Sequence, residues 1–547
     1  MKSLQVLNLG GNGFSHVENG IWEILGNLCN FIHLDLSYNQ IREILELPVN
    51  ISRCISYSLE SLDLSGNNIM GNLPSILGQL TNLKQLDFSY NKLSGEIPDC
   101  LGQLTEIEYL DISSNFIQGQ VSLSHLGSLS KLSYLDMSYN NVSLDVNSNW
   151  LPPSQLNKFR MASCNINHSP HWLQTQTRIQ DLDLSNTGIS GEPHEWFINT
   201  SSFLRLNLAN NFLTGPLPKQ LSLGRLEYDE HASFIDLSSN QFSGSIPLTF
   251  ERDCAIYSLQ LNNNSLTGHI PSSLMNCPLE ILDLSSNRLS GEIPPWTSYQ
   301  LLGLRILRLQ NNQLGEVNPR DDSGNSTTIL KSLCKLSLQI LDLQKNKLSG
   351  TIPNCWEYSE SLQVINLSSN NLSSVIPCSL GNLFSLKYLH LSDNKLYGHI
   401  PSCLSNLTQL KILNLGGNDL SGAIPKWFDT SFPSLEVLRL PQNKFNGLIP
   451  KKFCNFSHLR VMDLSNNQLT GKIPPCFGNL VGMNLPVNTS DDDLLVSSDM
   501  IPDNNIRETV AGIAREYSSV LNYLVNIDLS NNNLVGVVPK ELTKLFV

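Results

Sequence analysis

The residues of this chain that could do chemistry recur at one position of a repeated phrase. The phrase is LxxLxLxxN, and in eleven of its twenty copies the residue between the second and third leucines is aspartate, as in Asp63, Asp87, Asp111 and Asp136. Carboxylates stacked along a surface could bind a cation or transfer protons. Hydrated carboxylates at strand spacing repel one another by only about 1 kcal/mol or less. We therefore favour a solvated polar ladder over a cation site or a catalytic site.

Basic and aromatic residues interrupt this acidic row. Arg160, Arg308, His390 and Arg439 reverse the charge at the aspartate position. Outward strand positions are predicted for Tyr38, Tyr90, Tyr109, Tyr134 and Tyr139. Tyrosine and arginine on a rigid surface are typical anchors of protein interfaces. For each residue taken singly, an unrelated exposed side chain remains the alternative. The predicted ligand-binding residues are Tyr38, Tyr90, Tyr109, Tyr134, Tyr139, Lys158, Arg160, Arg305, Arg308, Tyr388, His390, Arg439 and Arg460.

Motifs for enzyme chemistry are missing from the sequence. The chain contains no HExxH, no pair of CxxC motifs, no GxSxG, no phosphate-binding loop and no set of kinase signatures. These motifs mark the commonest metal-dependent, nucleophilic and phosphoryl-transfer sites. We therefore expect no enzyme activity, no metal site and no cofactor.

The elements that must position these residues follow from the period of the phrase, which returns about every 24 residues. Leucines alternating with polar residues predict a short strand, and the asparagine that follows can bond the backbone of adjacent coils. A second phrase, L-x-G-x-[IL]-P, predicts a turn and an extended flank. The fold class expected is α/β, a leucine-rich-repeat solenoid. Its form would be a curved superhelical horseshoe with a parallel concave β-sheet, and 3₁₀ or helical turns and extended segments on the convex side.

Two gaps interrupt the period, one between Asn312 and Asn346 and a longer one between Asn467 and Asn532. Residues 1–480 contain about 19 repeats, residues 481–519 form an insertion, and residues 520–547 contain one further repeat. The insertion, called the island here, carries the acidic candidates Asp491, Asp492 and Asp493. Its composition fits a disordered linker and a recognition segment equally well. Because both ends stop within a repeat, we expect an array that is truncated at both ends.

Charge and composition limit the partners and the compartment. The net charge of −13 without a Lys/Arg block disfavours nucleic acid. No signal peptide and no apolar run long enough for a transmembrane helix is visible. The twelve cysteines recur at equivalent repeat positions, which predicts mostly free, buried thiols with at most an occasional bridge such as Cys378 to Cys403. The glycosylation candidates are Asn50, Asn141, Asn167, Asn199, Asn263, Asn325, Asn366, Asn371, Asn406, Asn455 and Asn488.

Several longer segments resemble one plant family. The L-x-G-x-[IL]-P phrase is similar to that of plant extracellular leucine-rich repeats. The segments SNWLPPSQL at 148–156, HWLQTQTRIQDLDLSNTGIS at 171–190 and EYSSVLNYLVNIDLSNNNLVGVVPKELTKL at 516–545 are more specific. They resemble plant receptor-like proteins of the branch that includes the receptors for fungal ethylene-inducing xylanase. Where this chain reads AGIAR before Glu516, that family usually carries a Lys-Gly pair.

The resemblance implies a receptor at the extracellular face of the plasma membrane. Such a receptor senses a microbial protein or peptide in defence and signals through adaptor and co-receptor kinases. Ligand contacts in the family come from the concave surface and the island. Two alternatives stay open: a receptor for an endogenous developmental peptide, and a soluble apoplastic inhibitor of a microbial cell-wall hydrolase.

Overall fold

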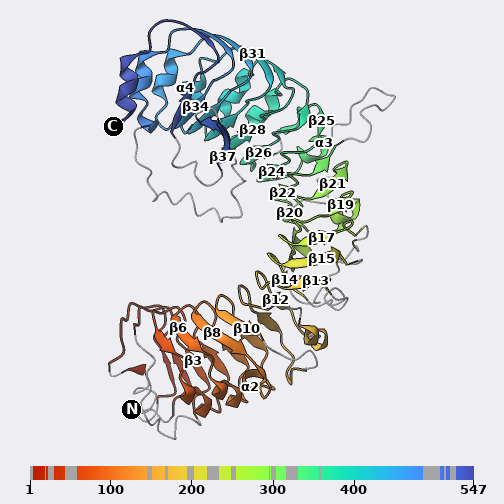
Figure 1. Cartoon of the computed structure of the whole chain (residues 1–547), viewed down its shortest axis with the longest axis vertical. Coiled ribbons are helices and arrows are strands. Elements are labelled where there is room, and N and C mark those ends of the chain that lie inside the picture. Colours follow the sequence, from red (N-terminus) through yellow and green to blue (C-terminus); the bar gives the residue numbers. More distant parts are fainter. Residues whose placement is uncertain are drawn as a thin grey trace. The chain divides into compact units, whose positions relative to one another are not determined.

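The chain forms two compact units, each built from coils that follow one another along the sequence. The computed structural model describes residues 4–18, 20–21, 30–42, 58–144, 151–166, 170–193, 203–218, 233–247, 250, 254–294, 296, 303–315, 330–356, 359–483, 506–510, 513–517 and 525–546. The first unit is Met1–Ser265 and the second is Leu266–Val547. Figure 1 shows the coils of both units stacked in sequence order.

Each unit contains one long parallel sheet with one short strand from each coil. The strands of the first unit are β1 (Val6–Asn8), β2 (His33–Asp35), β3 (Ser61–Asp63), β5 (Gln85–Asp87), β7 (Tyr109–Asp111), β9 (Tyr134–Asp136), β11 (Lys158–Arg160), β12 (Asp181–Asp183), β14 (Arg205–Asn207), β16 (Ser233–Asp236) and β18 (Ile256–Gln260). Those of the second are β20 (Ile281–Asp283), β22 (Ile306–Arg308), β24 (Ile340–Asp342), β26 (Val364–Asn366), β28 (Tyr388–His390), β30 (Ile412–Asn414), β32 (Val437–Arg439), β34 (Val461–Asp463) and β38 (Asn526–Asp528). The predicted leucine-rich-repeat solenoid is confirmed.

Further strands, two to six residues long, pair along the flank of the coils, where the L-x-G-x-[IL]-P phrase lies. In the first unit they are β4 (Met70–Asn72), β6 (Lys92–Glu96), β8 (Phe116–Val121), β10 (Asn141–Leu144), β13 (Ser190–Gly191), β15 (Phe212–Pro216) and β17 (Gln241–Ser243). In the second they are β19 (Thr267–Gly268), β21 (Arg288–Gly291), β23 (Gln313–Leu314), β25 (Ser349–Gly350), β27 (Asn371–Leu372), β29 (Tyr397–Gly398), β31 (Asp419–Ala423), β33 (Lys444–Leu448), β35 (Gln468–Gly471) and β39 (Asn533–Leu534).

Helical turns close the coils. The α-helical turns are α2 (Leu123–Leu126), α3 (Leu330–Leu333) and α4 (Phe428–Ser431). The 3₁₀ turns are η2 (Ser75–Gln79), η3 (Asp99–Gln103), η4 (His171–Thr175), η6 (Ser272–Asn276), η8 (Cys378–Asn382), η9 (Ser402–Asn406), η10 (Lys451–Asn455), η11 (Pro475–Asn479), η12 (Val481–Met483) and η16 (Lys540–Phe546). Most of the 3₁₀ turns begin directly after the proline of the flank phrase. Proline presets the backbone angle φ there and has no N–H that would need a partner.

Asparagine side chains join neighbouring coils, as the repeat predicts. The Nδ2 atom of Asn91 donates to the carbonyls of Leu64 at 2.9 Å and Phe88 at 3.2 Å, and its Oδ1 accepts from the N–H of Ile69 at 3.0 Å. Asn91 is 7% exposed. One side chain therefore satisfies buried backbone groups of two coils, which explains why the position recurs.

Disulfide bonds also join neighbouring coils in the second unit, which corrects the prediction of mostly free thiols. The bonds are Cys334–Cys355, Cys378–Cys403 and Cys454–Cys476, and their Cα–Cα distances are 5.5 to 5.8 Å. The expected Cys378–Cys403 bridge is confirmed. Partners 21 to 25 residues apart are one repeat apart, so stacking brings their Cα atoms within disulfide range. Cys254 and Cys277 are disulfide-bonded too, whereas Cys100 and Cys164 are free.

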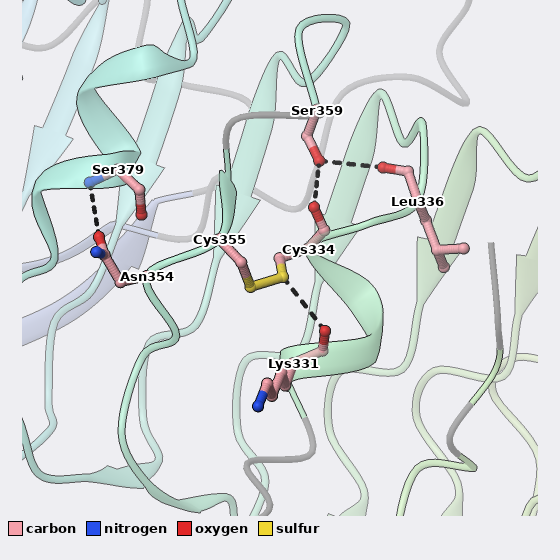
Figure 2. The surroundings of a disulfide bond; sticks show 7 residues. All are labelled: Lys331, Cys334, Leu336, Asn354, Cys355, Ser359 and Ser379. Carbon is pink, nitrogen blue, oxygen red and sulfur yellow. Dashed lines mark hydrogen bonds between the residues drawn. A yellow bond between two sulfur atoms is a disulfide. The ribbon is translucent and has the colours of Figure 1, made fainter.

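Figure 2 shows the contacts that hold neighbouring coils together around the Cys334–Cys355 bond. The hydroxyl of Ser359 donates to the carbonyls of Cys334 at 3.0 Å and Leu336 at 3.1 Å. The side chain of Asn354 accepts from the N–H of Ser379 at 3.1 Å. The disulfide and these hydrogen bonds thus connect three successive coils.

Part of the island has regular backbone structure. Strands β36 (Ile506–Val510) and β37 (Ile513–Tyr517) pair antiparallel, with Ile506 opposite Tyr517. The candidates Asp491, Asp492 and Asp493 lie outside the described residues. In the part of the chain that the structure covers, no helix has the length and apolar character needed to cross a membrane.

Candidate binding surface

In each three-residue strand of the long sheets, the first and third side chains point away from the leucine core. We call the surface that they form the strand face. It corresponds to the predicted concave face. In the first unit, parallel pairing places Gln85, Tyr109, Tyr134, Lys158 and Asp181 side by side in one row. The aspartates Asp87, Asp111 and Asp136 form the row beside it, followed by Arg160.

Two tyrosines stack at the centre of this surface. The ring centroids of Tyr109 and Tyr134 are 3.9 Å apart, with 25° between the ring planes. The hydroxyl of Tyr109 donates to Asp87 at 3.1 Å, and the hydroxyl of Tyr134 donates to Asp111 at 3.1 Å. Burial raises the pKa of both phenols, and the nearby carboxylates add to the effect. The two phenols therefore stay neutral hydrogen-bond donors.

Basic residues continue the network on β11. The ammonium of Lys158 donates to the Tyr134 hydroxyl at 2.9 Å and lies 4.3 Å from the ring centroid. Arg160 makes a two-pronged contact with Asp181, and its Nε donates at 3.0 Å. Burial, followed by the charge of Arg160, lowers the pKa of Lys158. The side chains of Lys158 and Arg160 remain 21% and 23% exposed, so both can still reach a partner.

The aspartate row is not the solvated ladder that the sequence predicts. Asp87 is 8% exposed, and its Oδ1 accepts from the N–H of Ser89 at 3.0 Å and from its hydroxyl at 2.7 Å. The same bonds recur at Asp63 and Asp111. The carboxylate folds back onto its own turn, which accounts for its burial. Burial is also the main cause that raises the pKa of Asp87 to about 6 and that of Asp136 to about 6.

Three of the predicted tyrosines lie in turns rather than on strands. Tyr38, Tyr90 and Tyr139 directly precede the ladder asparagine and have φ angles of 49° to 56°. Their side chains are 59 to 67% exposed. The prediction of outward strand positions is wrong for these three, because the chain turns into a left-handed conformation before the asparagine. They nevertheless lie at the edge of the strand face.

The strand face of the second unit is more buried and more apolar. Ile306, Ile340 and Val364 are 2 to 7% exposed and pack against one another, and Tyr388 is half-buried against them. Ile412, Val437 and Val461 form a similar cluster on the other side of Tyr388. Adjacent coils place these side chains at strand spacing, so apolar residues in register bury one another.

The charged candidates of the second unit differ in exposure. Arg439 is 7% exposed and donates to Asp463 at 3.2 Å. His390 is 6% exposed, and burial followed by the charge of Arg439 lowers its pKa to about 4. The prediction that these two residues project from the surface is therefore wrong. Arg308 lies 3.7 Å from Asp283 with 15% of its side chain exposed.

Arg305 and Arg460 directly precede their strands, β22 and β34. Arg305 is exposed, and it contacts Glu280 at 3.5 Å and donates to Gln339 at 3.1 Å. Arg460 is half-buried. Among the candidates that the structure describes, Tyr109, Tyr134, Lys158 and Arg160 share one network of contacts.

Sequence reasoning singled out the aspartate row but not Asp181, the partner of Arg160. Asp181 is the first residue of its strand, a position that varies from coil to coil, so no recurrent spacing marks it. On the same strand, Asp183 lies 3.4 Å from Arg205 and accepts from Asn207 at 3.2 Å. In the described parts of the chain, no group of three or more His, Cys, Asp or Glu residues could hold a metal ion.

The glycosylation candidates divide by exposure. Asn141, Asn263, Asn371, Asn406 and Asn455 are exposed. Asn366 is 3% exposed, its Nδ2 donates to Gln344 at 3.1 Å, and its Oδ1 accepts from Ser368. A glycan on that nitrogen would break these bonds and has no room on β26, so the prediction fails there. Asn50, Asn167, Asn199, Asn325 and Asn488 lie outside the described residues.

Comparison with protein families supports the repeat directly. A family described as "Leucine-rich repeat region" matches residues 1–142. The family "Leucine rich repeat" matches within 336–445, and "Leucine Rich Repeat" matches 256–277, 278–299, 458–480 and 523–545. The chain is a leucine-rich-repeat protein.

Curated relatives place this leucine-rich-repeat protein beside plant receptors. Receptor-like protein EIX2 of Solanum lycopersicum is 38% identical over 25% of this chain and 13% of its own length. Receptor-like protein 15 of Arabidopsis thaliana is 39% identical over 51% of this chain and 28% of its own length. The chain thus matches under a third of the length of these relatives. It resembles plant receptor-like proteins of the EIX kind.

Solved structures of plant receptor ectodomains share the fold over nearly the whole leucine-rich-repeat chain. The Arabidopsis receptor kinase HAESA, in complex with the peptide hormone IDA and the co-receptor SERK1, is 27% identical. Its TM-score is 0.74, and the match covers 99% of this chain and 84% of that one. A complex of PEPR1 with AtPEP1 is 25% identical, with a TM-score of 0.76, and the match covers 100% of this chain and 71% of that one.

Proposed function

We propose that this chain is the ligand-recognition part of a plant cell-surface receptor-like protein that senses a microbial protein or peptide in defence. Its place would be the extracellular face of the plasma membrane, and adaptor and co-receptor kinases would carry the signal inward. The resemblance to the EIX receptors supports the defence role. The ligand is expected on the strand face.

The observation that carries the proposal is the network on the strand face of the first unit. Tyr109, Tyr134, Lys158 and Arg160 combine stacked rings with basic groups that are fixed by neighbouring carboxylates. Rigid aromatic and basic side chains lose little entropy on binding, and such residues dominate the energetics of protein interfaces. In the second unit, the corresponding strand positions are largely buried, so they offer less contact area.

A binding experiment with two ligand sources tests this function. The 547-residue chain is immobilised and exposed either to proteins secreted by a filamentous fungus or to peptides washed from plant leaf apoplast. The test variant is Tyr134→Ala/Lys158→Ala/Arg160→Ala. The matched control is Phe116→Ala/Phe212→Ala, which removes rings that are 67% and 59% exposed on the flank. We expect a fungal protein to be retained by the original chain and the control, and lost by the test variant. Equal retention by the test variant would contradict the site.

A receptor for an endogenous peptide is the second candidate. It is favoured by the solved neighbours, since HAESA is in complex with a peptide hormone. Retention of an apoplastic plant peptide, with no fungal protein bound, would support this candidate and overturn the defence role.

A further inference from the structure

Exposed tyrosine rings recur on every second coil along one edge of the first unit's strand face. Tyr38, Tyr90 and Tyr139 belong to the coils of β2, β5 and β9 and are 59 to 67% exposed. At the same position of the coils between and after them stand small residues: Gly66, Ser114 and Ser163. We call the three tyrosines the tyrosine row.

The backbone holds the tyrosine row rigidly. The N–H groups of Tyr38, Tyr90 and Tyr139 donate to the next coil at 2.7 to 3.0 Å. The ring of Tyr38 lies over the next coil, since a Cβ atom built on Gly66 would be 2.8 Å from its Cδ1 atom. The absence of a side chain at Gly66 therefore makes room for the ring of Tyr38. With strands about 4.8 Å apart, rings on alternate coils repeat about every 10 Å.

The strand face beside the tyrosine row is acidic. From β2 to β9 the third residue of each strand of the long sheet is an aspartate: Asp35, Asp63, Asp87, Asp111 and Asp136. Glu60, Lys84 and Glu108 directly precede β3, β5 and β7. Lys84 is bound to Glu60 at 2.7 Å. The faces of tyrosine rings attract cations, and a surface of carboxylates attracts cations as well.

We propose that the tyrosine row docks an extended, cationic peptide segment with a basic side chain about every 10 Å. An extended polyproline II chain rises about 3.1 Å per residue, so every third residue would meet a ring. This proposal rests on the proposed function, because it names the chemistry of the protein segment that the strand face takes. It concerns the edge of that face, while the stacked tyrosines and Arg160 lie farther along it.

Peptide binding tests the proposal without requiring the natural ligand. The probe is a fluorescent (Lys-Pro-Pro)4 peptide, which places a lysine at every third residue. One control peptide has the same composition, with its four lysines adjacent, and the other is (Glu-Pro-Pro)4. Anisotropy titrations at low and physiological salt compare their affinities for the full chain.

The test variant is Tyr38→Asn/Tyr90→Asn/Tyr139→Asn. Asparagine is suitable because Asn186, Asn210 and Asn263 occupy the same left-handed position of other coils, with φ of 53° to 57°. The matched control is again Phe116→Ala/Phe212→Ala, on the flank. Equal melting temperatures would show that the variants fold alike.

We expect (Lys-Pro-Pro)4 to bind more tightly than either control peptide, and the test variant to weaken its Kd about tenfold or more, from three exposed ring contacts. No binding of (Lys-Pro-Pro)4, equal binding of the control peptides, or an unchanged Kd in the test variant would each overturn the proposal. Failure here leaves the proposed function standing if a fungal protein is still retained through Tyr134, Lys158 and Arg160. Loss of that retention overturns the proposed function independently.

Discussion

The two units share one repeat but use their strand faces differently. The first unit places partly exposed tyrosines and basic groups among carboxylates. The second buries isoleucines and valines in register and contains the buried pair of Arg439 and Asp463. Three disulfides join adjacent coils of the second unit, whereas the free thiols Cys100 and Cys164 belong to the first. The repeat does not fix the residue types at its outward positions, so one scaffold can carry a surface of aromatic and basic side chains in one unit and a more buried, disulfide-linked stack in the other.

Cys100 shows that a coil with a disulfide and a coil without one can differ at a single residue. It occupies the second position after the proline of its coil, as Cys403 and Cys476 do. In the preceding coil, however, Gly78 faces it, and a Cβ atom built on Gly78 would lie 2.7 Å from the Cβ of Cys100. A missing partner, rather than a different backbone, leaves this coil without a bridge.

Reduction of the disulfides should produce the largest difference between the two units, because it should destabilise the second unit more than the first. Each bond closes a loop of 21 to 25 residues. The chain-entropy estimate for such a loop is about 3 kcal/mol per bond. We expect a reductant to lower amide protection in residues 330–483 while residues 58–144 keep theirs. Hydrogen exchange followed by mass spectrometry measures both segments in one sample, and equal loss in both would contradict the comparison.

The buried ion pair of the second unit should contribute more to stability than the exposed pair of the first. Arg439→Leu leaves Asp463 buried without its 3.2 Å partner, which should cost about 3 kcal/mol or more. Arg160→Leu removes a contact between side chains that are 23% and 22% exposed, which should cost about 1 kcal/mol or less. Urea unfolding of both variants gives the two values. A larger loss of unfolding free energy for Arg160→Leu than for Arg439→Leu would contradict the prediction that the second unit holds the more stabilising ion pair.

The ladder should matter in both units to a similar degree. Asn91→Ala and Asn394→Ala each remove an amide that bonds two coils. Leaving buried backbone groups unpaired costs about 1 to 3 kcal/mol per group. We expect a loss of about 2 to 3 kcal/mol in each case. If only one of the two variants were destabilised, the shared scaffold would not be equally stabilised by its asparagines.

Two buried carboxyls should each contribute less stability as pH rises, at a different pH in each unit. Burial raises the pKa of Asp87 to about 6 in the first unit and of Asp342 to about 7 in the second. A carboxyl whose pKa is raised on folding adds stability that is complete below its unfolded pKa, near 4, and is lost as pH rises through the folded value.

Melting temperatures between pH 4 and pH 8 test this dependence. Asp342→Asn should remove the part of the decline near pH 7, and Asp87→Asn its share of the part near pH 6, to which Asp136 also contributes. The lowered pKa of His390 adds stability that rises between about pH 4 and pH 6.5, so each variant is compared with the original chain. A pH dependence unchanged by both substitutions would contradict the assignment.

The repeat, the strand register and the asparagine ladder could be predicted because each depends on spacing within one coil. Cys164 and Thr187 fill the asparagine position and still donate to backbone carbonyls, at 3.3 Å to Met137 and 2.8 Å to Leu184, so the pattern survives substitution. What depends on a neighbouring coil was harder to predict. The Cys334–Cys355 bond, the burial of His390 and the serine-capped carboxylate of Asp87 all required knowing which side chains meet.

The site could be predicted only in part, for the same reason. Tyr109, Tyr134, Lys158 and Arg160 were selected by residue type, and the structure brings them into one network. Their partner Asp181 was overlooked because its position varies from coil to coil. Tyr90 was placed on a strand because a single sequence does not reveal that φ becomes positive before the asparagine.

Photo-crosslinking tests the central claim most directly: the ligand binds the strand face of the first unit. A benzophenone amino acid replaces Tyr134 on that face, Tyr388 on the strand face of the second unit, or Phe116 on the flank, and each chain is exposed to fungal secreted proteins. The account predicts a crosslinked fungal protein at position 134 and little or none at positions 388 and 116. Crosslinks at 388 or 116 with none at 134 would contradict it.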